Sequence, residues 1–148
     1  MTAPLKAEYT AVPAEVFLQL FLAPLVSVTP WQQGMGPKMW TTNTIKPFRT
    51  VRRIGGPRTA DSDEPLMRVH TFGASYTQAS EEAARNDERV QMLVDYPGHA
   101  VTLPSGLVVH CDWAEIPEAA HEEQYGAESV VTRFVSAYRF GLSFVRAQ

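Results

Sequence analysis

The last part of the chain carries the longest strand pattern in the sequence, from Val130 to Val145. Apolar and polar residues alternate along it, so one face of the strand is apolar and the other carries arginines. A flat strand of this length would extend about 50 Å at about 3.3 Å per residue, too far for a domain of this size. We therefore expect a bend near Ala137 or Gly141. The apolar face comprises Val130, Phe134, Tyr138, Phe140, Leu142 and Phe144, and the opposite face comprises Arg133, Arg139 and Ser143.

Two segments are predicted to be helices. The first extends from Pro13 to Ala23, because proline is favoured at the first helical position. The second begins after Ser75, which forms a capping-box spacing with Gln78, and continues to Pro97. The first helix is apolar on all sides except at Gln19, so a single buried stripe does not account for it. Two interpretations follow: one side of this helix faces another subunit, or the helix is central and covered within its own domain.

The remaining patterns predict strands joined by turns and loops. Phe48 to Ile54 and Leu66 to Ala74 form one expected hairpin with a long acidic loop, and Ala100 to Leu103 with Leu107 to Ile116 form a second. Pro117 to Glu128 is expected to be an acidic loop. The order of helix, strands, helix and strands indicates an α+β fold. We expect a single domain over residues 1–148, with an antiparallel or mixed sheet and two helices packed on one side of it.

The composition excludes several classes of protein. The formal net charge is −3 and 45% of the residues are hydrophobic, which suits one folded domain and argues against a protein that coats nucleic acid. The single cysteine cannot form an intramolecular disulfide, so we expect assembly in the cytoplasm. The apolar stretch from Val16 to Val28 is broken by Gln19 and Pro24 and is shorter than the roughly 20 residues of a membrane span. No membrane association is expected.

Reactive residues are adjacent only at His110-Cys111-Asp112. Neighbouring residues of a strand point to opposite faces, so His110 and Cys111 do not form a nucleophile and base pair. We expect Cys111 to share an apolar face with Trp113, and His110 to share the opposite face with Asp112. The other histidines lack the spacing of a metal site. The sequence therefore predicts no enzyme activity, no catalytic residue, no metal and no cofactor.

Charge is divided between two parts of the chain. Lys and Arg but no acid occur between Val16 and Ala60, and acids but no Lys or Arg occur between Val90 and Thr132. Three interpretations remain: the two parts neutralise each other within one domain, they meet head to tail between copies in a ring, or the basic hairpin contacts phosphate. The basic residues are Lys38, Lys46, Arg49, Arg52, Arg53 and Arg58, and the acidic ones are Asp95, Asp112, Glu115, Glu118, Glu122, Glu123 and Glu128.

A long segment without periodicity, Thr29 to Thr44, contains two tryptophans, Trp31 and Trp40. Loops of this length are usually functional or order against a partner. Buried aromatic side chains often dominate the energy of an interface, so both tryptophans are candidate partner contacts. The other interpretation is that the loop folds back over its own core.

Several short motifs in a fixed order resemble the tail terminator proteins of long-tailed phages, particularly those that infect actinobacteria. The resemblance covers nearly the whole chain and rests on the order and spacing of these motifs. They are Ala23-Pro24-Leu25 after the apolar helix, Val51-Arg52-Arg53-Ile54-Gly55-Gly56 before an acidic loop, Val69-His70-Thr71-Phe72 before an Ala-rich helix, Val101-Thr102-Leu103-Pro104-Ser105-Gly106, Asp112-Trp113, and Tyr138-Arg139-Phe140-Gly141-Leu142.

The resemblance implies a structural virion protein that assembles as a hexameric ring at the head-proximal end of the tail tube. Such a ring stops tube growth, binds the major tail tube protein on one face and a head-completion or stopper protein on the other, and lets DNA pass without sequence-specific binding. Two alternatives stay open: a stopper protein of the neck, and a small-molecule binding or isomerase domain with a pocket lined by Phe134, Tyr138 and Trp113. The candidate interface residues are Trp31, Trp40, Lys46, Arg49, Arg52, Arg53, Arg58, Glu115, Glu118, Glu122 and Glu123.

Overall fold

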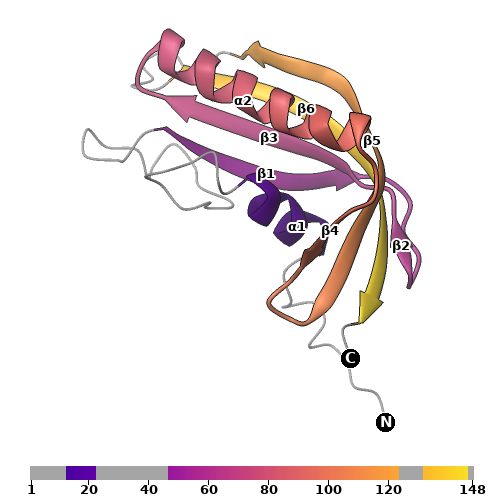
Figure 1. Cartoon of the computed structure of the whole chain (residues 1–148). Coiled ribbons are helices and arrows are strands. Elements are labelled where there is room, and N and C mark those ends of the chain that lie inside the picture. Colours follow the sequence, from indigo (N-terminus) through magenta and orange to yellow (C-terminus); the bar gives the residue numbers. More distant parts are fainter. Residues whose placement is uncertain (1–12, 23–46, 124–131, 147–148) are drawn as a thin grey trace.

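The computed structural model describes residues 13–22, 47–123 and 132–146 (Figure 1). The predicted loop Thr29–Thr44, with Trp31 and Trp40, lies outside the described residues, and so does Lys46. The elements are α1 (Pro13–Leu22), β1 (Phe48–Gly55), β2 (Ser62–Asp63), β3 (Leu66–Gly73), α2 (Tyr76–Asp95), β4 (His99–Thr102), β5 (Leu107–Glu122) and β6 (Thr132–Arg146).

The strands form one antiparallel sheet in the order β1-β3-β6-β5-β4, and the short strand β2 pairs with β6 outside this path. Helix α2 packs against β3, β5 and β6, and α1 lies against β1 and β4 on the same side (Figure 1). The predicted α+β fold, with two helices on one side of the sheet, is therefore confirmed. We call the opposite side of the sheet the outer face.

Both predicted helices are present close to the expected bounds. Helix α2 begins after Ser75, whose Oγ accepts a hydrogen bond from the Gln78 backbone N–H at 3.1 Å. The Gln78 side chain reaches back and accepts from the Ala74 N–H at 2.6 Å, one residue before the position in an ideal capping box. The predicted first hairpin is also present, because β1 and β3 pair directly. The tiny strand β2 in its loop had no recognisable pattern.

The long C-terminal strand is bent, as its length required (Figure 1). Strand β5 runs beside it and carries an extra residue between Cys111 and Trp113, opposite Gly141, and further irregularities opposite Ala137. Such bulges bend a strand and increase its twist. Both positions at which we expected the bend therefore coincide with irregular pairing.

Trp113 occupies the outer face, where it lies across Gly141. Phe140 and Leu142 point into the core, so the position between them belongs to the outer face. A Cβ at position 141 would lie only 2.5 Å from Cδ1 of Trp113 and nearer still to two other indole atoms. The prediction that Trp113 shares a face with Cys111 is therefore wrong, because the extra residue of the bulge reverses the alternation.

Strand β5 is longer than predicted. Residues 117–122, expected to belong to an acidic loop, continue the strand and pair with β6. Pro117 is accommodated in the irregular stretch between Glu115 and Glu118, where no regular ladder N–H is needed. Pairing with a long, apolar neighbouring strand thus outweighs the local preference of proline and glutamate for a loop.

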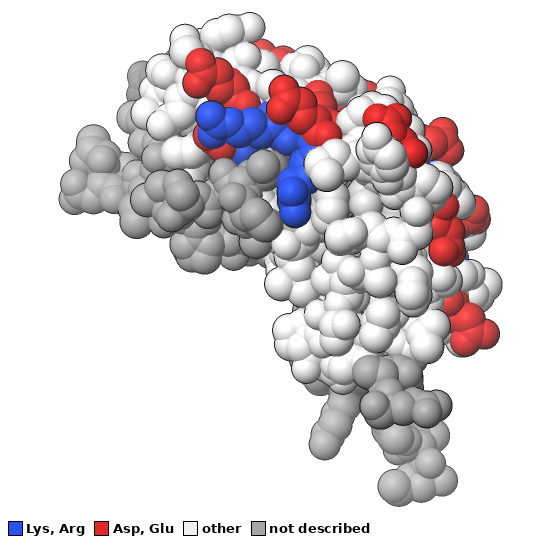
Figure 2. Space-filling view, in the orientation of Figure 1, with Lys and Arg blue, Asp and Glu red and all other residues white. Residues whose placement is uncertain are grey.

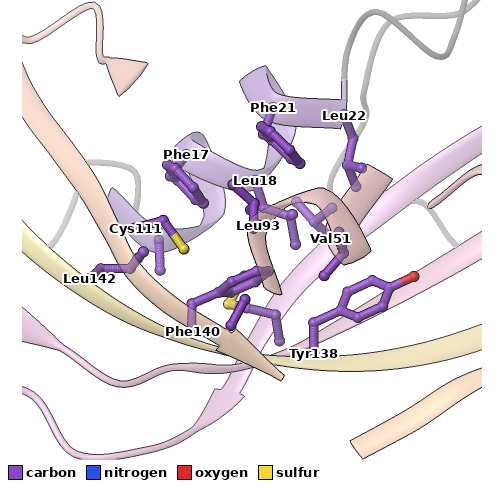
Figure 3. Close-up of a cluster of buried hydrophobic side chains, with 14 of the residues drawn as sticks. Phe17, Leu18, Phe21, Leu22, Val51, Leu93, Cys111, Tyr138, Phe140 and Leu142 are labelled. Carbon is purple, nitrogen blue, oxygen red and sulfur yellow. The ribbon is translucent and has the colours of Figure 1, made fainter. Parts of the chain in front are cut away.

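Helix α1 is largely covered within its own domain (Figure 3). Phe17, Leu18, Phe21 and Leu22 are at most 4% exposed, and the ring of Phe17 packs edge-on against Phe140 with centroids 5.9 Å apart. These contacts favour the interpretation of a central helix over that of a helix facing another subunit.

Candidate intersubunit surface

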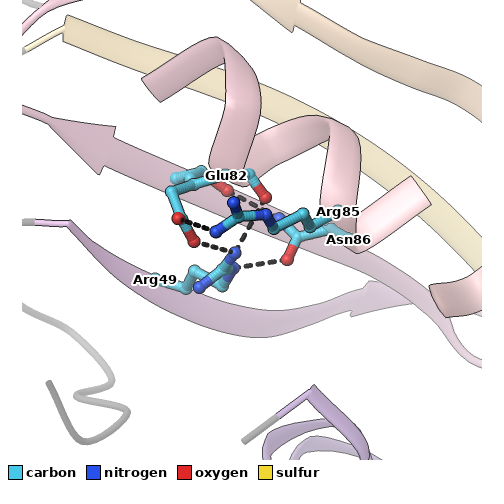
Figure 4. A network of polar contacts seen from close by, with 5 residues as sticks. Arg49, Glu82, Arg85 and Asn86 are labelled. Atoms are coloured by element: carbon cyan, nitrogen blue, oxygen red, sulfur yellow. Dashed lines mark hydrogen bonds and ion pairs between the residues drawn. The ribbon is translucent and has the colours of Figure 1, made fainter. Parts of the chain in front are cut away.

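Arg49 is not available to a second subunit, because its side chain is completely buried against α2 (Figure 4). Its guanidinium forms a 2.8 Å ion pair with Glu82 and donates a hydrogen bond to Asn86. Asn86 in turn donates to Thr71 on β3 at 2.7 Å. Burial lowers the pKa of Arg49, and the Glu82 carboxylate opposes that effect. The assignment of Arg49 to an interface is therefore corrected: it anchors α2 to the sheet.

Arg53 is engaged within the chain as well. Its guanidinium lies 2.7 Å from the buried carboxylate of Asp63 and donates to the carbonyl of Gly56. The short strand β2 holds Asp63 beside β6. Arg53 therefore fixes the acidic loop onto the sheet. Among the described members of the predicted basic set, Arg52 and Arg58 are the exposed cations.

Arg52 is one of three arginines that lie close together on the outer face. It is directly opposite Arg68 in the pairing of β1 with β3. Arg68 is opposite Ala137 on β6, and Arg139 lies two residues further along that strand on the same face. None of the three forms an ion pair among the described residues. We call Arg52, Arg68 and Arg139 the outer-face arginines.

The acidic candidate interface residues lie on β5 or directly after it, and all four are exposed: Glu115, Glu118, Glu122 and Glu123. Glu115 is opposite Arg139 and Glu118 is opposite Ala137, so both belong to the outer face, and we call them the outer-face glutamates. Glu118 lies 3.2 Å from the ring of His121. Glu123 forms a 3.0 Å ion pair with Arg133 of β6, so its charge is matched within the chain.

The basic and acidic parts of the chain do not neutralise each other among the described residues. Strand β1 lies at one edge of the sheet, and β3 and β6 separate it from β5. The ion pairs of the basic part lead to Glu82 and Asp63, neither of which belongs to the acidic part. In the view of Figure 2, charged side chains gather over α2 and along one border of the molecule, whereas β4 (His99–Thr102) contains no Lys, Arg, Asp or Glu.

The expected pocket of the small-molecule alternative is not assembled. Trp113 lies on the outer face, whereas Phe134 packs against Ala79 and Ala83 of α2 on the helix side. The Tyr138 hydroxyl is buried and donates to Asp87 at 2.6 Å, and burial raises the pKa of that phenol. The three residues predicted to line one cavity therefore do not share one.

Cys111 has the environment of a core residue. Its side chain is fully buried, and burial raises the pKa of the thiol to about 12. A thiol of that pKa is protonated at neutral pH and is a poor nucleophile. Within the described segments, no group of His, Cys, Asp and Glu side chains is arranged to hold a metal ion.

Two groups of functional interest were not identified from the sequence. Arg68 was unremarkable there, because only the strand pairing places it beside Arg52. Asp87 interrupts the apolar stripe of α2, yet it accepts hydrogen bonds from both Tyr138 and the Ala120 N–H. The polar face predicted for the last strand did indicate the exposed position of Arg139.

Comparison with known proteins gives no identification: no family model matches the chain, and a search of curated proteins finds no match either. Among the described helices, none is long and apolar enough to cross a membrane.

Proposed function

We propose that the chain is a structural protein of a phage tail, a tail terminator that forms a ring at the head-proximal end of the tail tube. The observation that carries this proposal is the position of Arg52 at one edge of the sheet and of Glu115 and Glu118 near the other. Complementary patches on different sides of a subunit make heterologous contacts, and such contacts close into rings. This arrangement favours the head-to-tail interpretation of the segregated charge.

A second observation concerns the motifs on which the resemblance to tail terminators rests. Asp112-Trp113 and the motif that contains Gly141 are far apart in the sequence, but the indole of Trp113 lies directly across Gly141. The spacing of these motifs thus has a structural reason, since the two must meet at the bend of the sheet. This contact supports the proposal, because it gives two of the motifs a common structural role in the chain.

A mechanical function also suits the chemistry of the described side chains. The buried polar groups, such as Arg49 with Glu82 and Tyr138 with Asp87, are bonded to each other and hold helix to sheet. Cys111 is buried, and burial raises the pKa of its thiol. In the proposed ring, the chain contributes shape and contact surfaces, the tube protein binds one face, the stopper binds the other, and DNA passes through the centre.

Native mass spectrometry tests this proposal with the purified chain, first alone and then with the major tail tube protein of the same phage. A hexamer in either sample, and its retention on the end of assembled tubes in electron micrographs, is the expected result. A ring that binds an isolated neck protein but not tubes would favour the stopper alternative. A chain that stays monomeric or dimeric in both samples would contradict the proposal.

A further inference from the structure

A single row of residues crosses four strands of the outer face with a steady change of charge. From β1 to β5 its members are Arg52, Arg68, Ala137 and Glu118, each opposite the next in the strand pairing. Adjacent strands lie about 4.8 Å apart, so the row spans about 14 Å from the first cation to the carboxylate. The sheet is thus positive at the β1 edge of this row and negative at the β5 edge.

The basic end of the row is unfavourable in an isolated subunit. Like charges directly opposite each other on neighbouring strands repel, and this is the relation of Arg52 to Arg68. Nε of Arg68 is also buried without a hydrogen-bond partner. A carboxylate brought to this end from outside the chain would relieve the repulsion between the two guanidinium groups.

The backbone at both edges is already occupied near the charged row. On β1, the Arg53 N–H donates to the carboxylate of Glu15 of α1 at 2.8 Å. On β5, the Ala120 N–H donates to Asp87 of α2 at 2.9 Å, and Pro117 has no N–H to donate. Backbone N–H groups that already have a partner, proline residues and bulges all prevent an added strand from pairing with the edge of a sheet. A contact at these edges therefore depends on side chains.

From these observations we infer that neighbouring copies of the chain meet edge to edge in the same orientation, with Arg52 and Arg68 of one copy against the outer-face glutamates of the next. The inference rests on the proposed ring function and specifies its contact. Repeating the row from copy to copy places each negative end beside a positive end. A nucleic acid fits the arginines less well, because the glutamates on the same face repel a phosphate backbone.

Two double variants with reversed charge test the contact. One carries Arg52→Glu with Arg68→Glu, and the other carries Glu115→Arg with Glu118→Arg. A control matched to the second variant, Glu81→Arg with Glu88→Arg, makes the same Glu-to-Arg change at two exposed positions of α2, away from the row. Circular dichroism verifies that each variant is folded, and native mass spectrometry at low ionic strength, with and without tail tube protein, measures the rings.

Each reversed variant alone should lose rings by about tenfold or more, whereas the control should assemble like the wild type. An equal mixture of the two reversed variants should recover rings in which the copies alternate, identified by equal numbers of the two masses. Recovery also requires that both variants are folded, so it separates a broken contact from a broken fold.

Rings that persist in either reversed variant, or folded variants whose mixture does not recover, overturn the contact and leave the ring function standing. A wild type that forms no ring with or without tube protein overturns both. Binding of a short DNA duplex by the wild type that the arginine-reversed variant loses, without any change in rings, would assign the arginines to nucleic acid instead.

Discussion

The bend of the sheet depends on the absence of a side chain at Gly141, and Gly141→Ala tests that dependence. An ideal Cβ at this position lies 2.5 Å from Cδ1 of Trp113, with two other indole atoms nearer. The indole must move or the two strands must separate, and overpacking of this kind costs about 1–3 kcal/mol. For a chain of this length, about 2 kcal/mol corresponds to a decrease in melting temperature of about 4–8 °C.

A thermal melt followed by circular dichroism measures the effect, and Gly55→Ala in β1 is the matched control. Gly55 has no neighbouring atom within 4 Å of an added Cβ, so the same substitution should leave the melting temperature within about 2 °C of the wild type. In a chain that also carries Trp113→Ala, the Gly141→Ala substitution should cost less than about 0.5 kcal/mol, because the obstructing ring is gone.

The reasoning is wrong if Gly141→Ala is as stable as Gly55→Ala, or if its cost is unchanged after Trp113→Ala. The first result would mean that the indole is not held across Gly141. The second would mean that the cost arises from the backbone rather than from this contact.

Three further predictions concern buried and half-buried groups. Arg49→Met should lower the free energy of unfolding by about 3 kcal/mol, because Glu82 and Asn86 lose a buried partner. The same substitution at exposed Arg52 should change the free energy of unfolding by less than about 0.5 kcal/mol. Urea denaturation measures both variants, and equal effects would contradict the buried network. Tyr138→Phe should cost about 2 kcal/mol in the same assay through loss of the hydrogen bond to Asp87, and a neutral result would show that this bond is dispensable. Burial, assisted by Arg133 and Arg68, lowers the pKa of His70 to about 4 in the folded chain. The unfolded chain takes up its proton near pH 6.5, so this contribution to stability is complete above that pH and is lost as the pH falls toward 4. His70→Gln should therefore flatten the decrease in melting temperature between pH 7 and pH 4.5, and an unchanged slope would refute the assignment.

The sequence alone was sufficient for the elements whose signals are local. The alternation of the last strand predicted its inward residues and its need to bend, and the spacing of Ser75 and Gln78 located the start of α2. These predictions are correct because strand alternation and helix capping depend on residues within a few positions of one another. The opposite faces of His110 and Cys111 follow from the same rule.

The errors arose where a distant partner decides the outcome. Residues 117–122 form a strand because β6 offers a long partner, and Trp113 changes face because one bulge shifts the register there. Arginine is usually exposed, so the sequence suggests a surface position for Arg49. Glu82 and Asn86 of α2 supply the partners that make its burial favourable.

The sequence thus determined that this chain has segregated charge, an apolar first helix and a strand too long to be flat. Only the tertiary structure decided that α1 is covered by its own domain, that Arg53 is bound to Asp63, and that Arg68 stands beside Arg52. The physical reason is that charge and hydropathy are properties of residues, whereas a contact surface is made by the order and register of strands that are far apart in the chain.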